Sequence, residues 1–141
     1  MTDQSGPPAP RGTILVVDDQ EPVCEGLRSK LEGAGFTALT ARSGRTGVAL
    51  LRQHASDIRA VLLDLRLPGE DTSTVYDEMR RLRPDLPVIL ITSIPEALAR
   101  AELGRPDLAG FLQKPFDRVT FLRTLRAALE GMGNAPPRRW G

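Results

Sequence analysis

Short apolar segments of strand length alternate five times with longer stretches whose apolar residues recur at helical spacing. The first apolar segment, 14–17, is rich in β-branched residues and is followed by a helical stretch at 21–34. In that stretch Val23, Leu27 and Leu31 are spaced to share one helix face. The same alternation predicts strands at 14–17, 37–41, 60–63, 88–91 and 109–113, and helices at 21–34, 43–54, around 75–82, 95–103 and from 117 onward.

The predicted strands are apolar throughout, which is typical of a parallel sheet covered by helices on both faces. Crossover connections between parallel strands are right-handed, so only a few topologies are possible. One common arrangement is the doubly wound, flavodoxin-like sheet with strand order 2-1-3-4-5, which binds its ligands where strands 1 and 3 part. The pattern therefore predicts an α/β fold with a five-stranded parallel sheet and five helices.

Polar residues follow or end four of the predicted strands. Asp18 and Asp19 follow the first strand, Asp64 the third, Thr92 the fourth and Lys114 the fifth. In a sheet of order 2-1-3-4-5 these residues would meet at the carboxyl edge. Three carboxylates in one place repel one another, so the site requires a cation. Mg²⁺ suits it, because this ion is held by carboxylates, waters and phosphate oxygens.

This combination of groups favours phosphoryl transfer to a carboxylate. A bound metal neutralises the incoming phosphoryl group while a nearby carboxylate attacks phosphorus in line. An attacking aspartate forms an acyl phosphate. The Lys114 ammonium can pair with one phosphoryl oxygen, and the Thr92 hydroxyl can donate to another.

Four segments, in order along the chain, resemble the signatures of the response-regulator receiver family. They are Val-Val-Asp-Asp at 16–19, Leu-Leu-Asp-Leu-Arg-Leu-Pro-Gly at 62–69, Ile-Thr-Ser at 91–93 and Gln-Lys-Pro-Phe at 113–116. The similarity covers roughly residues 12–131. It implies the strand order 2-1-3-4-5 for the sheet.

The resemblance also implies the roles of the acidic residues. Asp64 matches the phosphoacceptor, which takes its phosphoryl group from a phosphohistidine of a sensor histidine kinase or phosphotransfer protein. Asp19 matches a direct Mg²⁺ ligand, and Asp18 matches a residue that helps through water. The backbone carbonyl of Arg66 matches the group that completes the metal shell beside Asp64.

A switch is implied by the same resemblance. Thr92 matches the hydroxyl that moves toward the new phosphate, and Lys114 matches its basic partner. Phe111 would then follow Thr92 inward, changing a surface made by the fourth helix, the fifth strand and the fifth helix, which a downstream protein reads. The Lys114–Pro115 bond matches one that is usually cis in the family.

Several positions depart from the family pattern. Phe111 stands where tyrosine is frequent, and Thr72 stands where glycine is frequent, which stiffens the start of the third helix. Pro95 limits the movement of the loop after Thr92. Arg66 places a cation beside the phosphoryl group, where it either shields the acyl phosphate from water or pairs with a neighbouring acid.

Two other functions were weighed. A phosphatase of the haloacid-dehalogenase type also uses an aspartate nucleophile with Mg²⁺, but it needs a general acid two residues after the nucleophile. Arg66 occupies that position here and cannot serve as the acid. A flavin- or nucleotide-binding module would need a phosphate-cradling loop after the first strand, where Asp18 and Asp19 would repel phosphate.

Composition narrows the remaining possibilities. A chain of 141 residues with 40% hydrophobic content suits one domain, predicted at 12–131 between a flexible leader (1–11) and a flexible tail (132–141). The net charge of +1 gives no global basic field for direct nucleic-acid binding. The apolar runs are too short to span a membrane, and the single Cys24 suits a reducing cytoplasm. A stand-alone regulator and a segment of a hybrid histidine kinase both fit, and neither would make this domain an enzyme beyond its own phosphorylation and dephosphorylation.

Overall fold

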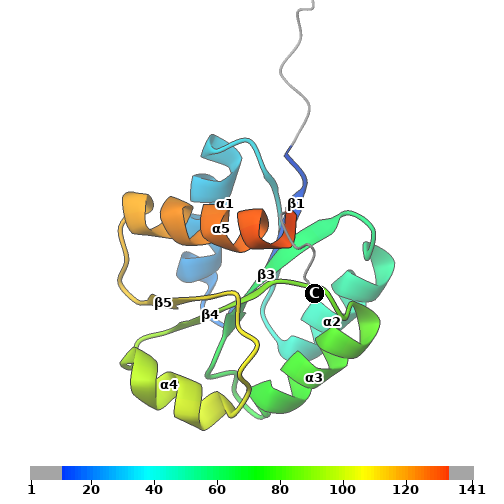
Figure 1. Cartoon of the computed structure of the whole chain (residues 1–141), viewed down its shortest axis with the longest axis vertical. Coiled ribbons are helices and arrows are strands. Elements are labelled where there is room, and N and C mark those ends of the chain that lie inside the picture. The colour runs from blue at the N-terminus through cyan, green and yellow to red at the C-terminus, as the bar shows by residue number, and fades with distance from the viewer. Residues whose placement is uncertain (1–10, 134–141) are drawn as a thin grey trace, which may run out of the picture.

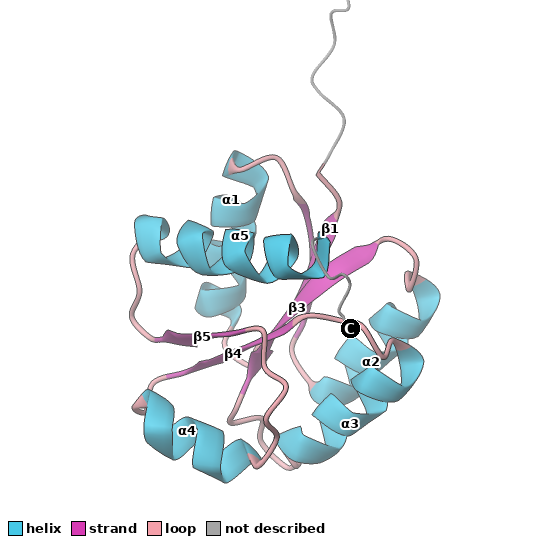
Figure 2. Cartoon of the chain, viewed as in Figure 1, coloured by secondary structure: helices cyan, strands magenta, loops and turns pink. Residues whose placement is uncertain are grey.

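The computed structural model describes residues 11–133, which form five consecutive βα units (Figures 1 and 2). Of the predicted leader and tail, residues 1–10 and 134–141 lie outside the described residues. The elements are β1 (Thr13–Val17), α1 (Glu21–Gly33), β2 (Thr37–Ala41), α2 (Gly44–Gln53), β3 (Ile58–Asp64), α3 (Thr72–Leu82), β4 (Val88–Thr92), α4 (Glu96–Leu103), β5 (Gly110–Gln113) and α5 (Arg118–Gly133).

The five strands form one parallel sheet of order β2-β1-β3-β4-β5, which confirms the predicted fold class. Helices α1 and α5 cover one face, and α2, α3 and α4 cover the other (Figure 1). Successive residues of a strand point to opposite faces. Leu15 and Val17 accordingly pack in the layer with α2, α3 and α4, whereas Ile14 and Val16 pack against α1 and α5. Both layers bury apolar side chains, so β1 is apolar at every one of these positions.

Side-chain caps and one glycine set several helix ends. The predicted cap Ser43 accepts a hydrogen bond from the backbone N–H of Thr46 at 3.1 Å at the start of α2. Asp117 accepts one from the N–H of Thr120 at 2.7 Å at the start of α5. Gly104 directly follows α4, and its φ of 69° is a left-handed conformation that glycine adopts without steric cost.

The structure differs from the predicted pattern at the start of β3 and refines the buried faces of α1 and α5. β3 begins at Ile58 rather than at residue 60, because Arg59 interrupts the apolar run in the sequence but not the strand. The Arg59 guanidinium donates to the backbone carbonyl of Arg11 at 2.8 Å. On α1, Leu27 and Leu31 are buried as predicted, but Cys24 is buried with them and Val23 is only half-buried. On α5 the buried apolar face includes Phe121, Leu125 and Leu129.

Candidate phosphoryl-transfer site

The carboxyl ends of the strands place the predicted site residues at one edge of the sheet. Asp18 directly follows β1, and its N–H donates to the carbonyl of Ala41 at 3.0 Å. Asp64 and Thr92 are the last residues of β3 and β4. Lys114 directly follows β5, and its N–H donates to the carbonyl of Thr92 at 2.7 Å. The order of the strands, with β1 beside β3 and β3 beside β4, makes these ends neighbours.

Three acidic side chains come together there. One carboxylate oxygen each of Asp18, Asp19 and Asp64 lies within 4.8 Å of the others. Asp18 is 0% exposed and Asp64 is 4% exposed, whereas Asp19 is half-buried. Two buried carboxylates at this separation disfavour a second negative charge unless a cation is present. The cluster therefore needs more positive charge than its own backbone provides.

Lys114 supplies one positive charge to this cluster. Its Nζ lies 2.7 Å from Oδ2 of Asp18 and 3.8 Å from Oδ2 of Asp64, and its side chain is 18% exposed. The closer partner is thus the aspartate after β1, not the predicted phosphoacceptor. An ammonium in this place can turn toward a phosphoryl oxygen on Asp64, because it is a point charge on a flexible stem.

Backbone N–H groups two residues downstream hold one oxygen of each buried acid. Gln20 N–H donates to Oδ1 of Asp18 at 2.9 Å, and Arg66 N–H donates to Oδ1 of Asp64 at 3.2 Å. Oδ2 of Asp18 accepts no well-aligned hydrogen bond within residues 11–133, although Lys114 lies beside it as an ion pair. A buried oxygen left in this way is costly unless a cation meets it. The oxygen ligands and the excess negative charge fit Mg²⁺.

The environment of Asp64 makes its carboxyl group harder to ionise than an ordinary aspartate when no metal is bound. Burial raises the pKa of Asp64 from 3.8 to about 6, and the neighbouring Asp18 carboxylate adds to the rise. The Arg66 N–H and the Lys114 ammonium oppose this shift. A divalent cation would oppose the rise in the pKa of Asp64 and favour the ionised carboxylate, the form that can attack phosphorus.

This raised pKa predicts a pH-dependent stability. The folded protein binds the Asp64 proton more tightly than the unfolded chain, so the free energy of unfolding falls as pH rises from about 4 to 6. Asp64→Asn removes the charge. In chelator, we expect it to raise the free energy of unfolding by about 1–3 kcal/mol near pH 7.5. Urea unfolding at the two pH values measures the difference, which should nearly vanish at about pH 4; an equal effect at both would contradict the assignment.

Thr92 and Phe111, the predicted switch residues, differ in their burial. Thr92 is 1% exposed, and its Oγ1 accepts a long hydrogen bond from the N–H of Ile94 at 3.5 Å. Phe111 is half-buried on β5 and packs against the core layer that contains α4. Thr92 ends β4, whereas Phe111 lies on β5, the next strand of the sheet. The Lys114–Pro115 bond is cis, as the family resemblance implied.

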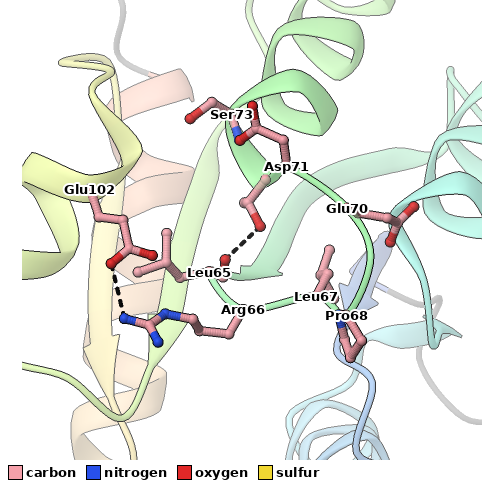
Figure 3. Close-up of a pocket in the computed structure, with 9 residues that line it drawn as sticks. Leu65, Arg66, Leu67, Pro68, Glu70, Asp71, Ser73 and Glu102 are labelled. Atoms are coloured by element: carbon pink, nitrogen blue, oxygen red, sulfur yellow. Dashed lines mark hydrogen bonds and ion pairs between the residues drawn. The ribbon is translucent and has the colours of Figure 1, made fainter.

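The loop between β3 and α3 is tied down by contacts that its sequence did not disclose. Thr72 donates its Oγ1 hydrogen to the carbonyl of Leu65 at 2.6 Å and is buried, which holds the start of α3 against the loop. Glu70 accepts hydrogen bonds from the N–H groups of Gly44 at 2.6 Å and Arg45 at 2.9 Å at the start of α2. The Arg66 side chain turns to α4, where its guanidinium pairs with Glu102 at 2.9 Å (Figure 3). Two roles were considered for Arg66, shielding the acyl phosphate and pairing with a neighbouring acid. The structure shows the second, with Glu102 as the acid.

No helix within residues 11–133 combines the length and apolar character needed to cross a membrane.

The sequence of this chain matches one family model and several curated proteins. A family model described as the response regulator receiver domain matches residues 14–126. The chain is 32% identical over 130 residues to the transcriptional regulatory protein GlrR of Escherichia coli (strain K12). The matched region covers 90% of this chain but only 28% of GlrR. It is 34% identical over 123 residues to protein PilH of Pseudomonas aeruginosa, which covers 84% of this chain and 98% of PilH.

Solved structures of other proteins share the fold of this chain. The crystal structure of NtrX from Brucella abortus superposes with a TM-score of 0.81 at 26% identity, over 89% of this chain and 29% of that chain. These matches support a receiver and not the haloacid-dehalogenase-like phosphatase that was weighed from the sequence. The chain belongs to the response regulator receiver domain family of two-component signal transduction.

Proposed function

We propose that Asp64 accepts a phosphoryl group from a phosphohistidine on a histidine kinase or phosphotransfer protein. The observation that carries this proposal is the meeting of three carboxylates within 4.8 Å, with the Lys114 ammonium beside two of them. Asp64 is the central acid, since it ends the strand between β1 and β4. The domain catalyses only its own phosphorylation and the later hydrolysis, in the cytoplasm.

The proposed metal ligands are Asp18, Asp19, Asp64 and the backbone carbonyl of Arg66, with Asp18 acting through water. Bound Mg²⁺ would neutralise charge on the phosphoryl oxygens during transfer. The protein positions the remaining groups. The backbone N–H groups hold Oδ1 of Asp18 and of Asp64, and the second oxygen of each faces the Lys114 ammonium, where the incoming ligands would also bind.

The transfer itself needs one bond formed and one broken. The Asp64 carboxylate attacks phosphorus, and the P–N bond of the phosphohistidine breaks, its electron pair staying on the imidazole. Lys114 pairs with one phosphoryl oxygen and Thr92 donates its hydroxyl hydrogen to another. These roles are supported by the Lys114 ammonium, which lies 3.8 Å from Oδ2 of Asp64, and by Thr92, which ends the strand next to β3.

The proposed output surface is the face formed by α4, β5 and α5. Leu98 on α4 is 61% exposed and Val119 on α5 is 62% exposed, and they are the exposed large hydrophobic residues of the described chain. A downstream protein that covered this face would bury both side chains, which would favour its binding. Movement of Thr92 toward the phosphate, followed by Phe111, would alter this face for a downstream protein.

Incubation with acetyl phosphate tests the proposal, with intact mass as the measurement. In Mg²⁺ we expect the protein to gain one phosphoryl group. In chelator the rate of gain should fall about 100-fold or more, since metal stabilisation of transferred charge contributes several kcal/mol. A gain that is equally fast in chelator would contradict the metal site, and no gain in either condition would contradict the proposed function.

A further inference from the structure

Arg66 contacts both Asp64 and α4, and so links the proposed phosphorylation site to this helix. Its backbone N–H donates to Oδ1 of Asp64 at 3.2 Å, while its guanidinium pairs with Oε1 of Glu102 at 2.9 Å. Figure 3 shows the arginine side chain reaching across from the loop to the helix. A change at Asp64 therefore acts on the residue whose side chain contacts α4.

Two other polar contacts hold the carboxyl end of α4 without involving this loop segment. Ser73 donates its hydroxyl hydrogen to the carbonyl of Leu103 at 2.7 Å. Arg105 forms a two-pronged pair with Asp77, at 2.8 and 2.7 Å. Both contacts run to α3. The end of α4 therefore stays attached to α3 when Arg66 releases Glu102.

The Arg66–Glu102 pair is the one suited to break. Its side chains are 61% and 45% exposed, and exposed ion pairs contribute little to stability. A phosphoryl group on Asp64 would carry close to two negative charges and three acceptor oxygens, against one charge on Glu102. Arginine binds phosphate with paired hydrogen bonds, so the phosphoryl group competes strongly for it.

We propose that Glu102 is a positioning residue that holds the Arg66 guanidinium away from Asp64 and thereby sets the lifetime of the acyl phosphate. This inference rests on the proposed function. After phosphorylation, the Arg66 guanidinium exchanges between two positions, one paired with Glu102 and one paired with the phosphoryl group. When it covers the phosphoryl group it blocks the approach of water, and α4 loses its contact with the loop.

The step affected is hydrolysis of the acyl phosphate. Water attacks phosphorus, and the bond from phosphorus to the Asp64 oxygen breaks with its electron pair returning to the carboxylate. The proton lost by water goes to solvent, and inorganic phosphate leaves. A guanidinium lying over phosphorus occupies the path that the water needs. Weakening the hold of Glu102 should therefore lengthen the lifetime.

The test is the half-life of the phosphoryl mass in Mg²⁺ after acetyl phosphate is removed. We expect Glu102→Gln to lengthen the half-life about two- to fivefold, the range that one exposed ion pair supports. Arg66→Ala should shorten it, and Glu102→Gln should then have no effect in the Arg66→Ala protein. The matched control is Glu96→Gln on the same helix, whose carboxylate pairs with Arg100 within α4 at 2.7 Å and should leave the half-life unchanged.

Non-additivity distinguishes positioning from a general charge effect. If Glu102→Gln leaves the half-life of a phosphorylated protein unchanged, the inference is wrong while the proposed function stands. It is also wrong if Glu102→Gln has the same effect with and without Arg66, because the charge would then act without the arginine. A parent protein that gains no phosphoryl group overturns the proposed function, and this inference with it.

Discussion

Asparagine in place of Asp64 is expected to abolish the phosphoryl mass gain in Mg²⁺ and acetyl phosphate. The side chain of asparagine has nearly the shape of aspartate, but its amide carries no negative charge and is not a nucleophile toward phosphorus. The substitution also removes one of the three acids that approach within 4.8 Å, so the metal site is weakened at the same time. Intact mass before and after incubation measures the effect.

A matched control keeps this result from being a folding artefact. Asp71→Asn makes the same aspartate-to-asparagine change in the loop that follows β3, where Asp71 is exposed and caps α3 by accepting from the N–H of Ser73 at 3.1 Å. Asparagine caps helices about as well as aspartate, so this variant should fold and be phosphorylated normally. Full phosphorylation of the Asp64→Asn protein would show that another residue is the phosphoacceptor.

Truncation of Phe121 is expected to cause the largest loss of stability. Phe121 is fully buried between α5 and the sheet, and its ring lies 6.0 Å from that of Phe116. Phe121→Ala would remove most of a large side chain from a close-packed layer and leave a cavity. We expect the free energy of unfolding to fall by about 3–5 kcal/mol, a large part of the stability of a domain this size.

Urea unfolding measures this loss, with Val119→Ala as the control on the same helix. Val119 is 62% exposed, so its truncation should change the free energy of unfolding by no more than about 0.5 kcal/mol. If the free energy of unfolding falls by the same small amount in both variants, the packing of Phe121 does not hold α5 against the sheet. The comparison is valid while the slope of unfolding free energy against urea concentration stays similar in both proteins.

The sequence alone was enough to identify the fold and the composition of the candidate site. Strands buried on both faces must be apolar at successive positions, as Ile14 to Val17 are, and this pattern is local. A polar residue that breaks such a run marks the strand end, which is how Asp18, Asp64 and Lys114 could be assigned to one edge. The apolar pattern of a strand or helix depends only on residues close together in sequence, so it can be recognised without a structure.

Only the tertiary structure decided which distant side chains are partners. Lys114 lies closer to Asp18 than to Asp64, and Arg66 pairs with Glu102, 36 residues away in sequence. Glu70, in the loop before α3, accepts hydrogen bonds from the backbone N–H groups at the start of α2. Such contacts depend on how each helix is rotated and shifted on the sheet, which the packing of both core layers determines together. Spacing along the chain carries no record of that packing, because many pairings suit the same pattern of polar and apolar residues.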